Sequence, residues 1–600
     1  MERDEGTPTA AALRVPPPGT AAARSPAEAP PAGDAGGLGT AGGGTRSAAL
    51  AVAPSLGGAP ARARAEPGRP RMGLRSPWRW LGAFAGFFAA ASSPGRGPEA
   101  PAAGAPPAAP AASSGPLGSA PVGLGLGWWG AEPRRLPDWL QGLRAVGAET
   151  SPSTLLLPLP TFRALPKGTA DQVGDLYADL AEELSAWPAD SEEEAALWVA
   201  THCLFRWLVW APTGGLPAHT PPAQREAARR EAVLARIAMA RAGRWEALAA
   251  GAAKEARRRA KGRAQAPLRN GLEGRALANE VQRRVHKGEW KGAASLLQSR
   301  GVAPPTGATR AALQGKLVGG PEDLPPPRER PVCTTRGVSR GALLKALRSA
   351  PFSSAPGPSG TRFAHLQAMQ VNPRAMAWLG VLCDRLADGN IPESAVDFLA
   401  LTKLTPLLKD GGGIRPVAGG EVLRKLAART LVREHREALR EAVGEHQFGA
   451  GRPAGGETLV HTVQAVAAQR PEHAWVQLDI ANAFPSVCRR AVLDALAEHA
   501  PALLPLAEAF LRRPSSFVFV DASGQGEVLQ ATKGVEQGDV LGPLLFAAAF
   551  RGPLAALRDR LLDCLETECG YTREQAEAEL VLGAYLLGRR PRVPPCRRRG

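Results

Sequence analysis

The sequence contains few aromatic residues for its length. They make up only 5% of 600 residues, whereas glycine occurs 68 times and proline 57 times. Glycine and proline are concentrated toward the N-terminus, where the chain buries too little apolar surface to offset the entropy lost on ordering. We therefore expect residues 1–135 to be a disordered arm rich in Ala, Pro and Gly.

The few cysteines show no disulfide or metal-binding spacing. No two of them form a C-x-x-C pair, which argues against a disulfide scaffold and a zinc site and favours a reducing compartment. They are Cys203, Cys333, Cys383, Cys488, Cys564, Cys569 and Cys596.

The sequence also lacks a long apolar run. The best candidate, PWRWLGAFAGFFAAASS at residues 77–93, is shorter than the roughly 20 residues that cross a bilayer. Two interpretations of it stay open: the centre of a targeting signal, if translation began at Met72, or an apolar patch within the arm. A G-x-G-x-x-G spacing at residues 125–130 predicts no dinucleotide site, because no strand precedes it and no helix follows it.

Positive charge is in excess. Lys and Arg total 73 against 56 Asp and Glu, a formal charge of +17. This excess suits a polyanionic partner such as nucleic acid, but a GC-rich coding sequence also raises Arg together with Ala, Gly and Pro. The densest cluster, KEARRRAKGR at residues 254–263, lies at the end of a long polar helix predicted over residues 223–263. A solvated helix face, a nucleic-acid patch and a nuclear signal all fit it.

A mostly helical region is predicted over residues 136–320. Residues 171–187 and 192–210 carry apolar side chains at helical spacing, with Asp190 and Ser191 as a cap for the second helix. Two short helices around a proline turn are predicted within residues 285–317. Consecutive prolines then predict a stiff linker over residues 321–345.

After Gly341 strands and helices alternate irregularly, which favours an α+β fold. Lys409 and Arg415 flank DGGG, a tight turn between two predicted strands, and two cations at such a turn suit a triphosphate. Residues 517–530 predict a hairpin. The segment GVEQGDVLGPLLF at residues 534–546 follows it, with glycines for close backbone approach and the start of a buried helix.

The segment LDIANAFPSV at residues 478–487 places a carboxylate at the end of a predicted strand, residues 475–480. A carboxylate held at a strand end can bind a cation while the strand stays packed, so Asp479 is a candidate ligand. A solvated loop carboxylate is the alternative.

In this order, these motifs resemble the reverse transcriptase domain of non-LTR retrotransposons. The resemblance covers about residues 355–586, with a weaker similarity at residues 288–306, and the ordered set is more specific than any single motif. It implies right-hand polymerase fingers and a partial palm over residues 346–587. It also implies an RNA template, a DNA primer, deoxynucleoside triphosphates and Mg²⁺, a nuclear or cytoplasmic location, and neither secretion nor a membrane.

The resemblance assigns roles to several residues. Asp479 matches the first catalytic carboxylate, a ligand of both magnesium ions, and Ile480 would lend its carbonyl to one of them. Phe484 matches the aromatic that excludes a 2′-hydroxyl. Arg415 and Lys409 match triphosphate-binding cations, with Lys403 as the alternative to Lys409. The remaining matches are the loop beneath the nascent base pair (Gln537 and Gly538), a structural Asp539, and a fingers-to-palm connection (residues 447–449, Gly455 and Gly456).

The sequence departs from the family at its Tyr-x-Asp-Asp turn. Residues 579–586 predict the preceding strand, and Tyr585 and Leu586 match, but Leu587 and Gly588 replace both aspartates. Residues 588–600 form a basic Arg/Pro tail with no thumb. Because the metal ions need more than one carboxylate, we expect that this chain does not polymerise DNA by itself, whether a frame slip, a missed exon boundary or decay produced the change. The alternatives are a non-catalytic nucleic-acid-binding protein and a decayed element product.

Overall fold

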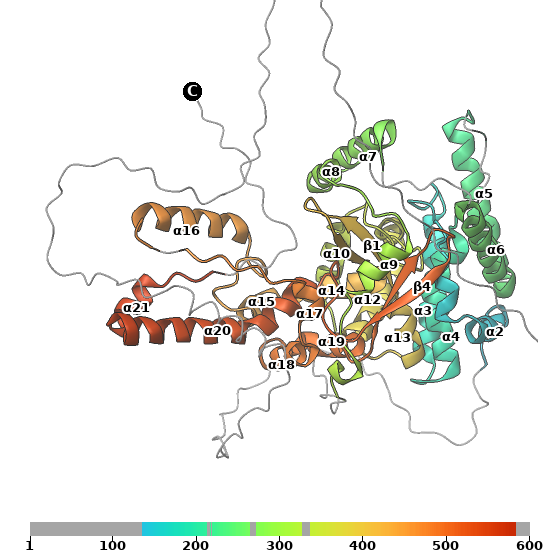
Figure 1. The fold of residues 1–600 in the computed structure, drawn as a ribbon. Coiled ribbons are helices and arrows are strands. Elements are labelled where there is room, and N and C mark those ends of the chain that lie inside the picture. Colours follow the sequence, from blue (N-terminus) through green and yellow to red (C-terminus); the bar gives the residue numbers. More distant parts are fainter. Residues whose placement is uncertain are drawn as a thin grey trace, which may run out of the picture. The chain divides into compact units, whose positions relative to one another are not determined.

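The computed structural model describes residues 135–212, 217, 219–264, 272–326, 337–473 and 475–583 (Figure 1). The predicted arm up to residue 134, the 77–93 run, the glycine spacing at 125–130, the middle of the linker and the basic tail lie outside these ranges. Within them the fold mixes helices with one four-stranded sheet, and helices predominate. The α+β expectation is confirmed at this level.

Helices occupy the region before the linker. Their bounds are η1 (Asp138–Leu140), α2 (Gly142–Glu149), η2 (Pro152–Leu155), α3 (Ala170–Ala186), α4 (Glu192–Leu208), α5 (Pro222–Arg241), α6 (Trp245–Ala264), α7 (Gly274–His286), α8 (Trp290–Leu297), α9 (Gly307–Gln314) and η3 (Pro321–Asp323). The predictions of α3, α4, α8 and α9 are confirmed. Ser191 caps α4, because its side chain accepts a hydrogen bond from the N–H of Glu194 at 3.1 Å.

The single helix predicted over residues 223–263 was wrong. The chain forms α5 and α6 instead, two neighbouring helices in Figure 1. Gly243 lies between them at φ 70°, a left-handed conformation that ends helices and suits glycine. Trp245 then starts α6 fully buried, and its ring nitrogen donates to the carbonyl of Trp139 at 2.6 Å. The polar composition predicted helix correctly but did not reveal that this aromatic anchors a new one.

The sheet consists of two hairpins joined side by side in the order β2-β1-β3-β4. Strands β1 (Thr402–Leu408) and β2 (Ile414–Gly419) pair antiparallel around the DGGG turn, and β3 (Ser515–Val520) and β4 (Gly526–Ala531) do the same. Both predicted hairpins are confirmed. Strands β1 and β3 run parallel and are paired at Thr402 with Phe517 and at Lys403 with Val518.

The helices after the linker complete the fold. Their bounds are α10 (Arg340–Arg348), α11 (Phe363–Ala368), η4 (Met369–Val371), α12 (Pro373–Ala387), α13 (Glu393–Ala400), α14 (Val422–Glu434), α15 (Arg436–Ala442), α16 (Gly455–Gln469), α17 (Ala483–Ser486), α18 (Arg489–His499), η5 (Pro501–Leu503), α19 (Leu504–Leu511), α20 (Gly542–Cys569) and α21 (Arg573–Glu579). The main core contains side chains from both sides of the linker, including Tyr177 and Phe205 before it and Leu379 and Leu426 after it. The two regions therefore share one core.

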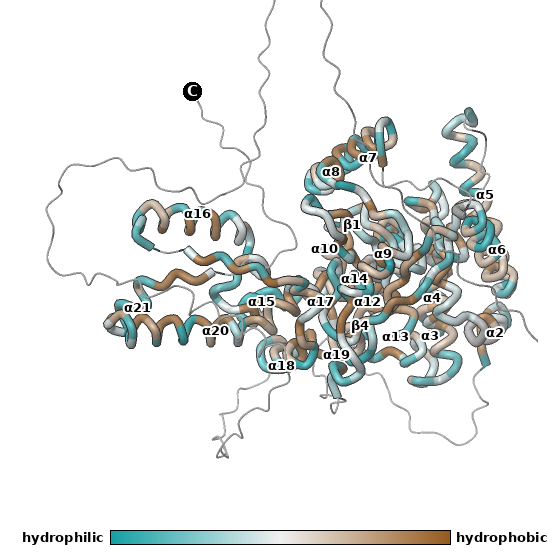
Figure 2. The backbone as a smooth tube through the Cα atoms, in the orientation of Figure 1, coloured by the Kyte–Doolittle hydropathy of each residue, from teal (hydrophilic) through white to brown (hydrophobic). Residues whose placement is uncertain are grey.

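The predicted strand at residues 475–480 was wrong. This stretch is not in a strand, and Trp475, Val476 and Leu478 are 47%, 73% and 43% exposed. None of the four described strands pairs with it, and a strand without a hydrogen-bonded neighbour is not stable in water. In Figure 2 the stretch that leads into α17 is coloured as hydrophobic. The stretch has the apolar composition of a strand, but none of the described strands pairs with it.

The strand predicted at residues 579–586 is also not formed where the chain is described. Helix α21 ends at Glu579, and residues 580–583 are irregular, whereas Tyr585 and Leu586 lie outside the described ranges. Glu579 is held by an ion pair with Arg470 at 2.7 Å and one with His473 at 3.1 Å. These contacts bring the end of α21 next to the chain that follows α16, which is where the unpaired stretch 475–480 begins.

Candidate nucleotide-binding site

Three segments that are distant in sequence meet at residues 534–539, here called the Gln537 loop. The N–H of Val535 donates to the carbonyl of Phe484 at 2.8 Å, and the N–H of Gly534 donates to that of Val487 at 2.9 Å. On the other side, the N–H of Ala418 in β2 donates to the carbonyl of Gln537 at 2.7 Å. Because β2 is an edge strand, the Gln537 loop occupies hydrogen-bonding positions that an edge leaves open. Backbone hydrogen bonds thus bring Phe484, the Gln537 loop and β2 together at one junction.

Gly538 is required by the close approach of this loop to β2. Its φ is 124°, and a Cβ atom added to it would lie 2.3 Å from the carbonyl oxygen of Ala418. Any other residue would therefore both strain the backbone and displace the strand. The glycine predicted from the motif has a steric reason in the structure.

Arg424 on α14 holds the Gln537 loop at two points, one on each side of Gln537. Its guanidinium pairs with Glu536 at 3.1 Å and with Asp539 at 2.5 Å, and it stacks over the ring of Phe510. Burial opposes the charged form, but the two carboxylates outweigh it and raise the pKa of Arg424. A charged clamp of this kind fixes the loop relative to the start of α14.

Asp539 and Glu536 are engaged in structural contacts. The second oxygen of Asp539 accepts a hydrogen bond from the N–H of Leu541 at 3.0 Å, just before α20 begins. Glu536 accepts one from the hydroxyl of Thr402 at 3.0 Å, at the start of β1. The Gln537 loop is thereby tied to β1, α14 and α20.

Phe484 projects from the short helix α17 onto α20. Its ring centroid lies 5.4 Å from that of Phe546, which in turn stacks on Phe550 at 5.7 Å. Phe484 is half-buried, so part of its surface remains open. The sequence expectation of a bulky aromatic beside a ligand site is compatible with this placement, and an ordinary packing role fits the same contacts.

The candidate cations lie on the β1–β2 hairpin. Leu407 pairs with Arg415 and Lys403 with Gly419 in the antiparallel register, and the N–H of Lys409 donates to the carbonyl of Gly413 at 3.2 Å. Opposed residues share a face, and Lys403 and Leu407 are an even number of residues apart in β1, so Lys403 and Arg415 belong to the same face of the hairpin. Lys409 lies at the turn near Arg415. Lys403 lies at the other end, toward the Gln537 loop, which begins its contact with β2 about 10 Å along the strand from Arg415.

Asp479 does not join a metal site in the described part of the chain. It is exposed on the unpaired stretch, although the next residue, Ile480, is half-buried and packs with Phe484 against the main core. Across the described ranges, no three His, Cys, Asp or Glu side chains lie together in a way that could hold a metal ion. Magnesium prefers several oxygen ligands in octahedral geometry. The residues described here therefore do not fit the Mg²⁺ site that the resemblance implies.

Two structural residues near the site were missed from the sequence. Arg489 is fully buried and donates to Ser515 and to four carbonyls, at Gly534, Leu511, Arg513 and Ala531, so it binds the Gln537 loop to β3 and β4. Its burial lowers its pKa to about 10. Arg424 is the second. No local pattern distinguishes Arg489, because its neighbour Arg490 is also an arginine and is exposed. For Arg424, the signal in the sequence was the pair of acids that flank Gln537, which suggests a cationic partner but does not identify it.

The fingers-to-palm motif shows a local hydrogen bond. The side-chain oxygen of Gln447 accepts from the N–H of Gly449 at 2.7 Å, and Gln447 is buried. Gly455 begins α16 and is the buried residue of that helix. The segment is thus ordered at its start, whereas α16 itself contributes little to the core.

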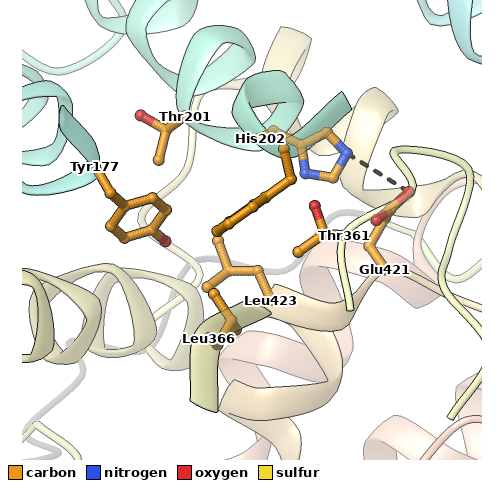
Figure 3. A pocket seen from close by; sticks show the side chains of 8 residues that line it. Tyr177, Thr201, His202, Thr361, Leu366, Glu421 and Leu423 are labelled. Carbon is orange, nitrogen blue, oxygen red and sulfur yellow. Dashed lines mark ion pairs between the residues drawn. The ribbon is translucent and has the colours of Figure 1, made fainter. Parts of the chain in front are cut away.

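A small cavity lies between α3, α4, α11 and the start of α14 (Figure 3). His202 points at Glu421, with 3.6 Å between ring nitrogen and carboxylate oxygen, and Ser359 donates to the same carboxylate through its N–H and hydroxyl. Burial raises the pKa of Glu421, but His202 and Ser359 outweigh it and lower the pKa. The cavity has room for about one water molecule, so it is too small to hold a substrate, and the residues around it connect the helices by packing and hydrogen bonds.

The comparisons with known proteins find one informative similarity. The chain is 28% identical over 240 residues to the retrotransposable element SLACS 132 kDa protein of Trypanosoma brucei gambiense. The match covers 39% of this chain but only 19% of the relative, so this chain spans a minor part of that protein. No protein-family model matches the chain. Among the helices within the described ranges, none has the length and apolar character needed to cross a membrane.

Proposed function

We propose that this chain is derived from a retrotransposon-type element and contains the fingers and part of the palm of an RNA-directed DNA polymerase. The observation that carries the proposal is the junction at which the backbones of Phe484 and Ala418 both bond to the Gln537 loop. The similarity to a retrotransposable element protein supports the same origin. The substrates would be deoxynucleoside triphosphates on an RNA template with a DNA primer.

The chemistry of the hairpin fits a triphosphate. Arg415 offers a planar fork of donors and Lys409 a compact point charge, with Lys403 as the alternative companion. Phe484 would lie beside the sugar, where its bulk leaves no room for a 2′-hydroxyl. The Gln537 loop, held by Arg424, would support the nascent base pair.

Polymerisation needs more than the residues described here. Polymerases of this type use Mg²⁺ to stabilise charge in nucleotidyl transfer, and Asp479 alone does not form such a site. At the positions where the family has two aspartates, this sequence has Leu587 and Gly588. The proposed activity of the sequence as given is therefore binding of primer–template and nucleotide, without extension.

Primer extension on an RNA template tests the enzyme assignment. The given chain is compared with a chain carrying Leu587→Asp and Gly588→Asp, and with that chain after Asp479→Asn. We expect extension by the restored chain alone. Equal extension by the restored chain and its Asp479→Asn variant would overturn the role of Asp479.

Nucleotide binding tests the site without requiring catalysis. Affinity for deoxythymidine triphosphate is measured in the given chain with an RNA–DNA primer–template present. Arg415→Ala should weaken it about tenfold or more, since a charge-assisted hydrogen bond contributes about 1.5–3 kcal/mol. Arg436→Ala, an exposed arginine on α15, is the matched control and should leave affinity unchanged. Equal affinities in the parent chain and in both variants would show that the hairpin does not bind the nucleotide.

A further inference from the structure

The outer face of α6 carries four exposed cations in consecutive helical turns. They are Lys254, Arg257, Arg258 and Lys261, here called the α6 basic face. Their spacing of i, i+3, i+4 and i+7 places them on one side of a helix. At 1.5 Å per residue the face is about 10 Å long.

The opposite side of α6 fixes this face toward solvent. Ala252, Ala256 and Ala260 are buried at i, i+4 and i+8, and α6 contacts α2 and α4. Trp245 anchors the start of the helix between the rings of Trp139 and Trp207, at 6.1 and 6.2 Å. The helix therefore cannot rotate to hide its cations without losing this packing.

Within the described ranges, Arg258 is the one cation of the α6 basic face that pairs with an acid. Glu255, the acid closest to it in sequence, is buried and is shared between Arg258 at 3.4 Å and Arg259 at 3.1 Å. Arg259 turns inward and donates to the carbonyl of Ala211 at 2.7 Å. Within the described ranges, Lys254, Arg257 and Lys261 form no ion pair. A solvated helix usually alternates charges of both signs, so the pattern here favours an anionic ligand.

The neighbouring β3–β4 turn does not supply a further acid to the α6 basic face. Gly524 in this turn lies against Ala260, since a Cβ atom on it would meet the Ala260 backbone at 2.9 Å. Asp521 of the same turn accepts hydrogen bonds from Ser523 at 2.6 Å and from the N–H of Gln525 at 2.9 Å. Both hydrogen bonds go to one oxygen of Asp521, Oδ1, and within the described ranges Asp521 forms no ion pair with the four cations.

We propose that the α6 basic face binds the sugar–phosphate backbone of nucleic acid, at a surface separate from the proposed nucleotide site. Phosphates of one strand follow each other at about 3.4 Å along a duplex axis, so four cations over about 10 Å match three or four of them. None of the four side chains is aromatic, and Trp245 is buried. The binding is therefore expected to use phosphate contacts without base stacking and to be independent of sequence.

A salt series tests this surface. A quadruple variant, with Lys254→Gln, Arg257→Gln, Arg258→Gln and Lys261→Gln in the full chain, is compared with the parent chain by fluorescence anisotropy on a labelled duplex DNA and a labelled single-stranded RNA. We expect the slope of log affinity against log salt to become shallower by about 3.6 on duplex and about 2.8 on single strands, if all four cations contact phosphates. The strand type with the larger change identifies the preferred ligand.

The matched control removes the same charge elsewhere. Arg374, Arg513, Arg558 and Arg573 each pair with acidic residues, and their combined change to Gln lowers the net charge equally. This control should retain the parent slope to within one unit. A control slope as shallow as that of the α6 variant would overturn the proposal, because net charge alone would then explain binding. An unchanged slope in the α6 variant would overturn it as well.

Separate measurements on the α6 variant test its folding and the polymerase assignment. Circular dichroism and the urea midpoint should change little in the α6 variant, because exposed substitutions usually alter stability by less than about 0.5 kcal/mol. Buried Glu255 also keeps its ion pair with Arg259 when Arg258 is replaced. Nucleotide affinity and its dependence on Arg415 should also be unaffected. If the α6 variant loses salt-dependent binding and Arg415→Ala still weakens nucleotide affinity, both proposals are supported. If the α6 variant loses salt-dependent binding but Arg415→Ala has no effect on nucleotide affinity, the α6 basic face is supported and the nucleotide site is rejected.

Discussion

The carbonyl of Phe484 accepts a hydrogen bond from the N–H of Val535 at 2.8 Å, although helices α18 and α19 and the β3–β4 hairpin separate the two residues in sequence. This bond links the candidate sugar-reading aromatic to the Gln537 loop through the backbone. Because the link does not depend on the Phe484 side chain, that side chain can be changed while the junction is kept.

Phe484→Val should relax discrimination against ribonucleotides. In the chain with both aspartates restored, the ratio of kcat/KM for deoxynucleotides over ribonucleotides should fall about tenfold, equivalent to about 1.4 kcal/mol. Phe550→Val, which loses a comparable ring in the same aromatic row, is the control and should keep the ratio. A ratio unaffected by Phe484→Val would leave that ring with a packing role only.

Arg424→Met should release the Gln537 loop. Removing one partner of a buried ion pair leaves two carboxylates uncompensated and typically costs about 3–5 kcal/mol. Hydrogen exchange at the N–H of Ala418 should accelerate, since its acceptor is the carbonyl of Gln537. Arg433→Met, on the same helix but exposed and bonded to Ser349, should show neither effect. Unchanged exchange at Ala418 in the Arg424 variant would show that the loop holds its position without the clamp.

Gly538→Ala should be destabilising, in contrast to a glycine in open space. A backbone conformation that L-residues rarely adopt costs about 1–3 kcal/mol, and the clash with Ala418 adds to it. Gly251, inside α6, has no neighbour within 4 Å of an added Cβ atom, so Gly251→Ala should raise stability by up to about 1 kcal/mol. Urea midpoints of the two variants should therefore move in opposite directions, and a shift of both in the same direction would contradict the steric argument.

The sequence predicted those elements whose signals are local. The β1–β2 and β3–β4 hairpins each follow from apolar runs around a glycine turn, and α4 follows from helical spacing with Ser191 at its cap. These features depend on residues only a few positions apart. Gly538 was expected to let the backbone approach a ligand, whereas in the structure it lets the Gln537 loop approach Ala418 of β2, a contact between distant segments.

The features that were mispredicted depend on distant partners. The stretch at 475–480 has the composition of a strand, but pairing requires a neighbour elsewhere in the chain, and none of the described strands supplies it. Trp245 divides the long polar helix because Trp139 and Trp207 hold it. Arg424 and Arg489 resemble surface arginines in sequence and are buried only because carboxylates and carbonyls from other segments converge on them.

His365 links the helical region to the rest of the core and should make stability depend on pH. Its Nδ1 accepts a hydrogen bond from the N–H of Arg362 at 3.2 Å, so its Nε2 carries the proton donated to the carbonyl of Phe162 at 2.8 Å. Its ring stacks on Phe205 at 5.0 Å. The imidazole is therefore held neutral, since a second proton would face a backbone N–H.

The pKa of His365 is lowered to about 4, chiefly by burial; the carbonyl of Phe162 partly opposes this shift, and the charge of Arg362 adds to it. The unfolded state has the ordinary pKa of about 6.5 and binds the proton first. The stabilising contribution is thus complete above pH 6.5, falls as the pH drops from 6.5 to about 4, and totals roughly 3 kcal/mol. Urea unfolding at several pH values should show this decline in the parent chain and a flatter dependence after His365→Gln. His461→Gln, at an exposed position of α16, should retain the parent slope, and an equal slope in all three proteins would mean that His365 is already charged in the folded state or exposed to solvent.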